Sequence, residues 1–400
     1  LMSKKRNFLF LQGPVSPFFK AIAKMLKGRG HTVSGISFCL GDEIYCPRPY
    51  VRYRGKLDEF SDFISKHLKA NLITDIMLFG DCRQQHKQAI EVAKALDIKI
   101  HVFECGYFRP YWITYELDGV NMNSPMVDVS EHFVGYPSSY DQAKELEHDI
   151  GSFFQQASFD ISYHLANLLN VFIYPHFRWH GNISPFVEYS GYVKRLLSSK
   201  KSDQKAARIT DQLLVKKTKY YLLPLQLDRD FQIQEHSDYS GMSDVINEVI
   251  PSFAQHAPSD AMLVVKLHPL DKGLVNIPHL IETLSEKYQL QQRVVFMDGG
   301  NIEWLVKNAV GVVTVNSTVG LMAIQFKVKA KILGYAFYNK KDLCFNGTLD
   351  DFWRSDFQPD HDLCQSFYHY LMDKTQVNGG LYDTKGIKAA IKNLPAKMGI

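Results

Sequence analysis

The sequence lacks paired cysteines, long apolar runs, internal repeats and a strong excess of either charge. Its 6 cysteines form no CxxC pair and no zinc-finger spacing, so we expect reduced thiols rather than disulfides or structural zinc. No apolar segment reaches the ~20 residues that a membrane-spanning helix requires. Any contact with a membrane is therefore expected to be peripheral. A formal net charge of +4 is too small to indicate a nucleic-acid-binding protein.

The composition is that of a folded protein with a large core. Hydrophobic residues make up 46% and charged residues 22% of the 400 positions, which excludes gross disorder. This length favours two domains over one. The first residues run directly into a predicted strand and turn without a signal-peptide pattern, so we expect a cytoplasmic protein.

Strands and helices alternate in two parts of the chain. In the first part, the expected strands are 7–12, 31–38, 75–80 and 99–104, and the expected helices are 17–27, 57–71 and 84–97. In the second part, the expected strands are 219–226, 261–269, 293–299, 309–316 and 329–335. Alternation at this spacing predicts right-handed crossovers and a parallel sheet in each part.

This pattern predicts an α/β protein with two Rossmann-like domains. We assign residues 1–130 to the first domain, 131–217 to a helical, aromatic-rich connecting region and 218–346 to the second domain. Residues 347–400 are expected to form a helical tail that packs back toward the first domain. Two parallel-sheet domains facing a cleft, with a helical mid-chain insertion, make a GT-B-like plan, although the fold alone does not fix the function.

Two buried strands of the second domain end abruptly at polar residues. One apolar run ends in the segment VVKLHP, which contains Lys266, His268 and Pro269. Another ends in the segment VVTVNST, which contains Asn316, Ser317 and Thr318. Ligands of open α/β sheets bind beyond the carboxyl ends of the strands. The Ser and Thr residues can cap the next helix, whose free N–H groups attract anions. Together these residues predict a nucleotide-phosphate site that needs no metal ion. The alternative is that the Ser and Thr residues only cap the helix, because capping and phosphate binding share the same sequence pattern.

A series of short motifs resembles a known family. LQGP (11–14), FGDCR (79–83), FECGYFRPYWITYE (103–116), LPLQ (223–226), KLHP (266–269) and NSTVG (316–320) occur in this order. This series is similar to that of the capsular polysaccharide biosynthesis proteins of the KpsS/LipB type. The KLHP and Ser-Thr junctions are also similar to the CMP-binding motifs of bacterial sialyltransferases.

The resemblance implies a retaining β-Kdo glycosyltransferase. Its donor would be CMP-Kdo, held by the second domain, and its acceptor lysophosphatidylglycerol, held by the first. The product would begin the poly-Kdo linker of a capsule. The implied location is peripheral, at the cytoplasmic face of the bacterial inner membrane, beside other capsule assembly and export proteins. No metal or other cofactor and no nucleic acid is expected. The alternatives are transfer of another CMP-sugar acid, such as a sialic acid, and a non-catalytic glycolipid-binding component of capsule export.

Retention of configuration implies a carboxylate nucleophile and an acid/base group. Glu104 directly follows a predicted strand and is the favoured catalytic residue. Relatives tend to have a second acidic residue where this sequence has Cys105, which leaves the identity of the nucleophile open. Asp81 is the other candidate, with Arg83 beside it, and a helix N-cap is the alternative role for Asp81. His268 is expected to assist at the donor phosphate together with Lys266.

Further residues are expected to contact the sugar or the acceptor. Arg109 lies near aromatic residues, and a guanidinium there suits a carboxylate or phosphate, although a packed loop is the alternative. The remaining candidates are Gln226 for the donor and Gln12, Gly13, Arg83, Tyr107 and Trp112 for the acceptor or sugar. Asp228 and Asp230 resemble a DxD metal motif, but an isolated pair of aspartates is usually solvated loop. The apolar segment 168–180 predicts either a patch for a lipid acceptor or ordinary helix packing.

Overall fold

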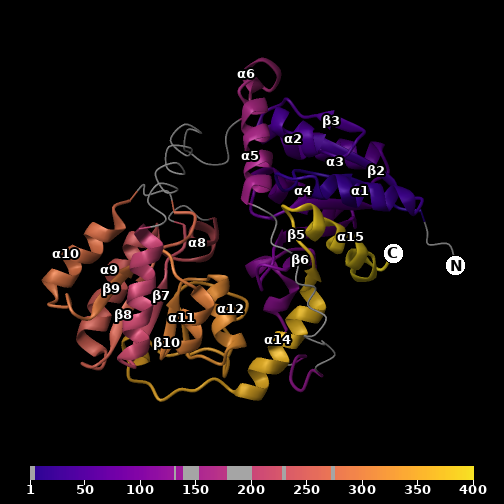
Figure 1. The fold of residues 1–400 in the computed structure, drawn as a ribbon. Helices are drawn as coiled ribbons and strands as arrows, with labels where there is room; N and C mark the ends of the chain where they lie inside the picture. The colour runs from indigo at the N-terminus through magenta and orange to yellow at the C-terminus, as the bar shows by residue number, and fades with distance from the viewer. Residues whose placement is uncertain (1–4, 130–131, 138–152, 178–200, 228–230, 272–274) are drawn as a thin grey trace. The chain divides into compact units, whose positions relative to one another are not determined.

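The structure is a computed structural model that describes residues 5–129, 132–137, 153–177, 201–227, 231–271 and 275–400. The chain forms two compact units (Figure 1). Unit 1 comprises Leu1–Asp128, Ser138–Asn182 and Tyr370–Ile400, and unit 2 comprises Val129–Pro137 and Ile183–His369. Within the described ranges, no helix is both long and apolar enough to cross a bilayer.

Unit 1 contains a sheet with the strand order β12-β6-β5-β4-β1-β2-β3. The strands are β1 (Asn7–Phe10), β2 (Thr32–Ser37), β3 (Tyr50–Arg52), β4 (Asp75–Phe79), β5 (Lys99–Cys105), β6 (Trp112–Leu117) and β12 (Gln376–Asn378). The five strands from β5 to β3 are parallel, whereas β6 runs antiparallel to both of its neighbours.

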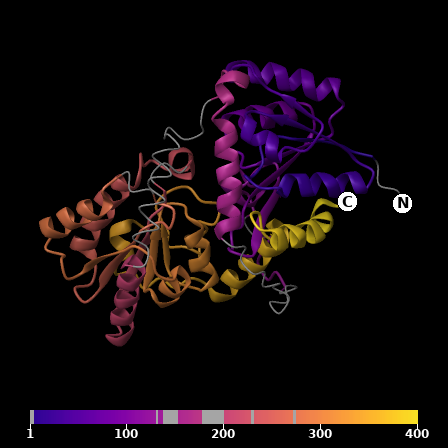
Figure 2. The ribbon, with the colours of Figure 1, turned by 45° about the horizontal axis from the view of Figure 1, so that its top comes forward.

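Helices cover both faces of this sheet because its buried strands carry apolar residues on each side. Along β1, Phe8 and Phe10 pack toward α1 (Phe18–Gly28) and α15 (Thr384–Met398). Leu9, between them, packs toward α3 (Phe60–Ala70) and α4 (Gln84–Ala95). Figures 1 and 2 show α15, in yellow, beside α1, in indigo. The other helices of unit 1 are α2 (Leu40–Tyr45), α5 (Phe153–Asn167) and α6 (Asn170–Ile173), with 3-10 turns η1 (Leu57–Glu59), η2 (Asn121–Asn123) and η3 (Pro125–Val127).

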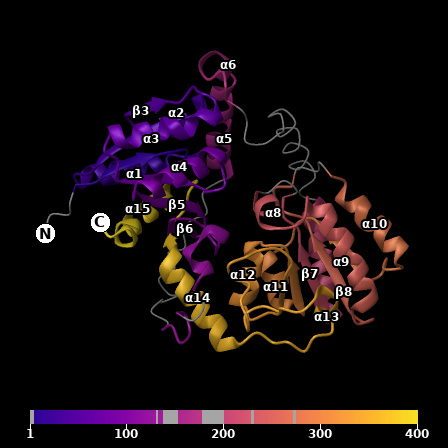
Figure 3. The ribbon, with the colours of Figure 1, turned by 180° about the vertical axis from the view of Figure 1, so that it is seen from behind.

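Unit 2 contains a parallel sheet with the strand order β11-β10-β7-β8-β9. The strands are β7 (Tyr220–Pro224), β8 (Met262–Lys266), β9 (Val294–Met297), β10 (Gly311–Thr314) and β11 (Ala330–Ile332). Helices α9 (Met242–His256) and α10 (Ile277–Lys287) pack on one face, and α11 (Ile302–Asn308) and α12 (Thr318–Gln325) on the other (Figure 3). Unit 2 also contains α8 (Phe231–His236), α13 (Leu349–Phe352) and a helical run that begins at residue 201. Helix α14 (His361–Thr375) begins in unit 2 and ends in unit 1.

The expected α/β class is confirmed, with a parallel sheet in unit 2 and a sheet in unit 1 that is parallel from β5 to β3. Two differences concern unit 1. The stretch expected as a loop after Glu104 is a hairpin turn, and Trp112 begins the antiparallel strand β6. Gly106 permits this hairpin because a Cβ there would overlap the Trp112 carbonyl group. The tail is also not wholly helical: β12 adds a strand beside β6, with Val377 opposite Ile113.

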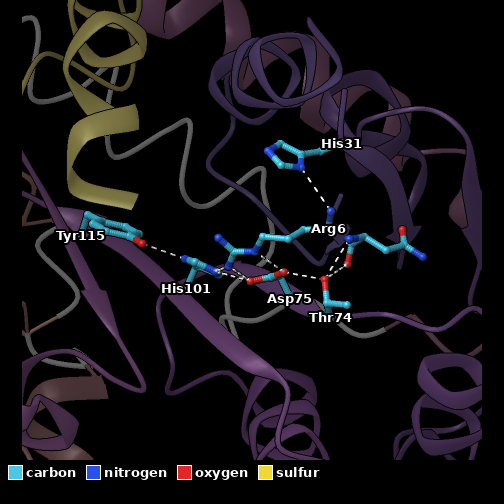
Figure 4. A network of polar contacts seen from close by, with 7 residues as sticks. Arg6, His31, Thr74, Asp75, His101 and Tyr115 are labelled. Carbon is cyan, nitrogen blue, oxygen red and sulfur yellow. Dashed lines mark hydrogen bonds and ion pairs between the residues drawn. The ribbon is translucent and has the colours of Figure 1, made fainter. Parts of the chain in front are cut away.

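A buried polar network joins the amino-terminal part of this sheet (Figure 4). Asp75, at the start of β4, accepts hydrogen bonds from Arg6 Nε at 2.9 Å and from Thr74 Oγ1 at 2.6 Å. His101 Nε2 lies 2.8 Å from Asp75 Oδ1, and His101 Nδ1 lies 2.7 Å from the Tyr115 hydroxyl. Burial acts to raise the pKa of Asp75, but hydrogen bonds from these partners lower it to about 2. Burial lowers the pKa of His101, against the opposing effect of Asp75.

This network makes the stability of unit 1 dependent on pH. An Asp with a lowered folded pKa stabilises the protein above its unfolded pKa of ~3.9, and this contribution is lost as the pH falls toward the folded value. His101, held neutral by burial, adds a loss of the same sign below its unfolded pKa of ~6.5. We therefore expect urea midpoints to fall from pH 7 to pH 3.

Asp75→Asn should lower the free energy of unfolding of unit 1 by about 3–5 kcal/mol at pH 7, because it breaks a buried ion pair. The variant should also show a weaker dependence on pH. Asp260→Asn is the matched control, since the pair of Asp260 with Lys219 is exposed and should contribute little. If the Asp75→Asn variant were as stable as the wild type, Asp75 would not stabilise unit 1 through this ion pair.

Candidate functional site

Three neighbouring strands of unit 2 end at predicted site residues. Lys266 is the last residue of β8 and lies opposite Pro224 of β7. Gln226 follows β7 by two residues, and Asn316 follows β10, the neighbour of β7 on its other side. Because all three strands are parallel, these residues lie along one edge of the sheet. The polar groups predicted for the donor therefore gather within a single unit.

Lys266 provides an ammonium group, and His268 provides an imidazole ring held by a hydrogen bond. Lys266 is buried, and its Nζ atom lies 3.4 Å from the carbonyl oxygen of Leu267. His268 is half-buried in a turn beyond β8, and its Nδ1 atom accepts a hydrogen bond of 3.0 Å from the Leu270 N–H. An acceptor role for Nδ1 places the proton of the neutral ring on Nε2, which makes Nε2 a donor. Pro269 is exposed beside them.

Gln226 and Asn316 bind one another across the ends of β7 and β10. Gln226 Nε2 donates to Asn316 Oδ1 at 2.9 Å, and the Asn316 N–H donates to Gln226 Oε1 at 3.2 Å. Asn316 Nδ2 also donates to the carbonyl oxygen of His236 at 3.1 Å. The two amide side chains thus link the ends of β7 and β10, which is a structural role in addition to the predicted contact with a ligand.

Ser317 is the N-cap of α12. Its Oγ atom accepts a hydrogen bond of 3.2 Å from the Val319 N–H, and Thr318 is the first residue of the helix. The Ser317 carbonyl oxygen accepts from the Tyr338 hydroxyl, whose ring lies so close to Gly320 that a Cβ there would be 2.6 Å from it. The start of α12 is therefore held in place by its own cap and by Tyr338.

In unit 1, Glu104 lies at the carboxyl end of β5. It is half-buried, and its Oε1 atom accepts a hydrogen bond of 2.8 Å from the Cys105 N–H. Burial raises the pKa of Glu104, while this hydrogen bond and the positive charges of Arg109 and Arg83 oppose the shift. Burial also raises the pKa of the Cys105 thiol to about 11, so it is protonated at neutral pH. The Cys105 thiol is thus not an anionic group, whereas Glu104 has properties that suit acid/base or nucleophilic chemistry.

Asp81 holds a neighbouring turn. It is 3% exposed, and its Oδ2 atom accepts hydrogen bonds from the Val120 N–H at 2.9 Å and from Asn123 Nδ2 at 3.1 Å. It is not the helix cap considered as its alternative role, because the N-cap residue of α4 is Arg83. Both hydrogen bonds to Asp81 Oδ2 thus come from the turn at Val120 and Asn123, which indicates a structural role for this carboxyl group.

Several residues predicted to contact a sugar or acceptor have partners inside the protein. Gln12 is 4% exposed; its Nε2 atom donates to Asp42 Oδ1 at 2.8 Å, and its Oε1 atom accepts from Gln85 at 3.1 Å. At Gly13, a Cβ would lie 2.7 Å from the Phe19 ring, so close packing explains that glycine.

The hairpin residues differ in exposure. The Tyr107 hydroxyl donates to Glu116 at 2.7 Å and accepts from the Asn121 N–H, and both Tyr107 and Trp112 are buried. Arg109 is exposed, with its Nε atom 3.3 Å from the Gly106 carbonyl oxygen, and Arg83 is half-buried. Among these candidates, the two arginines are the groups that the structure leaves accessible near Glu104.

Three buried groups of unit 1 had no sequence signal that marked them as site residues. Asp42, on α2, accepts from Gln12 and from the Tyr163 hydroxyl of α5, at 3.2 Å. These two residues and Gln12 line a cavity of about 10 Å³. Burial raises the pKa of Glu116, on β6, to about 7. Their positions depend on contacts between distant segments, which local patterns do not reveal.

Two further expectations concern metal binding and lipid binding. In the part of the chain that the structure describes, no group of three or more His, Cys, Asp or Glu side chains is placed to hold a metal ion. Asp228 and Asp230 lie outside the described residues. So do residues 178–180 of the apolar segment, whereas Val171 and Phe172 are exposed by 71% and 82%.

Comparisons with known proteins agree on one family. Residues 74–382 match the family described as "Capsule polysaccharide biosynthesis protein". The chain is 34% identical over 384 residues to the capsule polysaccharide export protein KpsS of Escherichia coli, covering 96% of this chain and 98% of that protein. It is 31% identical over 392 residues to the capsule polysaccharide modification protein LipB of Neisseria meningitidis serogroup A, covering 96% and 93%.

Among solved structures, a β-Kdo 2,7 transferase, KpsC of Thermosulfurimonas dismutans, aligns with a TM-score of 0.42 and 13% identity over 98% of this chain and 99% of that one. The family match and the full-length sequence relatives establish the assignment. The chain belongs to the capsule polysaccharide biosynthesis protein family.

Proposed function

We propose that this protein is a retaining β-Kdo glycosyltransferase that moves Kdo from CMP-Kdo to lysophosphatidylglycerol. The observation that carries the proposal is the row of polar groups at the carboxyl ends of β8, β7 and β10, headed by the buried cation of Lys266. In this role, Lys266 and the Nε2 donor of His268 bind the CMP phosphate. They stabilise the negative charge that develops on this leaving group. The amide pair of Gln226 and Asn316 positions the site.

Glu104 is the reacting carboxylate of the proposal. In the first step, it attacks the anomeric carbon, and the bond to the CMP phosphate breaks with its electron pair leaving on the phosphate. In the second step, the acceptor hydroxyl attacks the same carbon, the bond to Glu104 breaks and the hydroxyl proton passes to solvent. Two inversions give net retention. Arg83 and Arg109 bind the acceptor phosphate or the sugar carboxylate in bidentate fashion.

The proposed reaction uses no metal ion, because Lys266 and His268 provide the positive charge and the donor that a cation would supply. The proposed setting is the cytoplasmic face of the inner membrane, alongside other capsule assembly and export proteins. A lipid acceptor is consistent with the exposed apolar residues of α6, of which Phe172 is 82% exposed.

A mass measurement tests the proposal. The full chain is incubated with CMP-Kdo and lysophosphatidylglycerol, with and without EDTA, and the lipid is analysed by mass spectrometry. We expect the lipid to gain the mass of Kdo in both samples. Transfer from CMP-sialic acid in preference to CMP-Kdo would favour the other donor class. Binding of the lipid without any mass gain would favour a non-catalytic export component, and loss of transfer in EDTA would refute the metal-free reaction.

A further inference from the structure

The C-terminal segment brings one tyrosine to the same edge of the unit 1 sheet as Glu104. Strand β12 pairs with β6, and β6 pairs with β5, in both cases antiparallel. Therefore β12 runs parallel to β5, and the residues that follow it emerge at the edge where β5 ends. The side chain of Gln376 joins these strands, since its Oε1 atom accepts from the Tyr107 N–H at 3.0 Å and its Nε2 atom donates to Thr114 at 3.1 Å.

A tight turn after β12 fixes the position of Tyr382. Gly379 has a φ of 154°, and a Cβ there would lie 2.6 Å from Ala390 of α15. Asp383 caps α15 and accepts a hydrogen bond of 2.5 Å from the Gly386 N–H. The next residue, Thr384, accepts from Gln155 of α5 at 2.8 Å. Contacts on both sides thus hold the turn that carries Tyr382.

Tyr382 lies close to the residues around Glu104. It is half-buried and packs against the same apolar cluster as Cys105, the residue after Glu104. Burial raises the pKa of the Tyr382 hydroxyl well above its usual value, and the proximity of Cys105 and Glu104 raises it further, while Arg83 lowers it. The phenol therefore remains protonated at neutral pH and can act as a hydrogen-bond donor. Arg83 acts on the pKa of Glu104 as well.

We propose that Tyr382 is a further substrate-contacting residue of this site, where its hydroxyl donates a hydrogen bond to an anionic oxygen bound by Arg83. The inference rests on the proposed function. The anionic oxygen belongs to the acceptor phosphate or to the Kdo carboxylate, which present the same chemistry to a phenol and a guanidinium. Tyr382 acts by hydrogen bonding alone and forms no bond to the sugar.

Tyr382→Phe tests this role because it keeps the packed ring and removes only the hydroxyl. We expect kcat/KM to fall about 10- to 100-fold, the usual effect of losing a hydrogen bond to a charged group, with no change in Tm. A rise in KM for lysophosphatidylglycerol alone would identify the acceptor phosphate, and a rise in KM for CMP-Kdo alone the sugar carboxylate. Tyr53→Phe is the matched control, because its hydroxyl bonds only locally to the Lys56 carbonyl group among the described contacts.

A binding measurement separates this inference from the proposed reaction. Calorimetric titration of the full-length wild type and Tyr382→Phe with a soluble short-chain lysophosphatidylglycerol, and separately with CMP-Kdo, requires no turnover. We expect the variant to bind one of the two ligands about 10-fold or more weakly. The role of Tyr382 would be overturned if both proteins bound both ligands with equal affinity, or if the wild type bound neither ligand. It would also be overturned if the variant had a lower Tm but unchanged kcat and KM values. A wild type that binds but does not transfer would instead refute the proposed reaction.

Discussion

Glu104→Gln is expected to lower the rate of Kdo transfer by about 10³-fold or more, because an amide cannot replace a carboxylate nucleophile or base. The amide oxygen can still accept the hydrogen bond from the Cys105 N–H, so Tm should change little. The measurement is kcat with CMP-Kdo and lysophosphatidylglycerol at saturation. Glu91→Gln is the matched control, since Glu91 is exposed on α4.

The dependence of the transfer rate on pH should also reflect the ionisation of Glu104. Burial raises the pKa of Glu104, so its reactive carboxylate is lost on acidification at a higher pH than an ordinary Glu would show. We therefore expect kcat/KM to fall on the acid side beginning at that higher pH.

Asp81→Asn should mainly reduce Tm, because Asp81 holds the turn at Val120 and Asn123. Near-normal turnover in both Glu104→Gln and Asp81→Asn would exclude these carboxylates from the chemistry.

Lys266→Met is expected to reduce kcat/KM for CMP-Kdo by about 10²- to 10³-fold, since it removes a buried positive charge from the proposed phosphate site. Methionine retains most of the apolar stem of lysine, which should preserve packing at the end of β8. Titration of CMP should show weaker binding to the variant, with an unchanged affinity for the lipid.

A lysine of the same sheet provides the control for this change. Lys331, on β11, is half-buried and donates to the Gly347 carbonyl group at 2.7 Å. Lys331→Met should leave the affinity for CMP unchanged, even if it lowers Tm. If Lys266→Met and Lys331→Met bind CMP equally well, the phosphate site does not lie at the end of β8.

The sequence predicted the parallel strands well because each is a short buried apolar run bounded by polar or turn residues. Strand β8, expected within 261–269, spans Met262–Lys266, and β10, expected within 309–316, spans Gly311–Thr314. It did not predict the short parallel strand β3, nor β6 and β12. The pairing of β6 with β12 joins Ile113 to Val377, and no local pattern encodes a partner so distant in the chain.

The sequence by itself determined the alternation of strands and helices, the family motifs and the helix cap at Ser317, because each depends on residues close together in the chain. Tertiary structure decided which polar side chains have partners inside the protein. Gln12 pairs with Asp42, and the turn at Val120 pairs with Asp81, across segments that only the folded chain brings together. It also decided the raised pKa of Glu104, since burial and neighbouring charges arise only when distant segments pack around one carboxyl group.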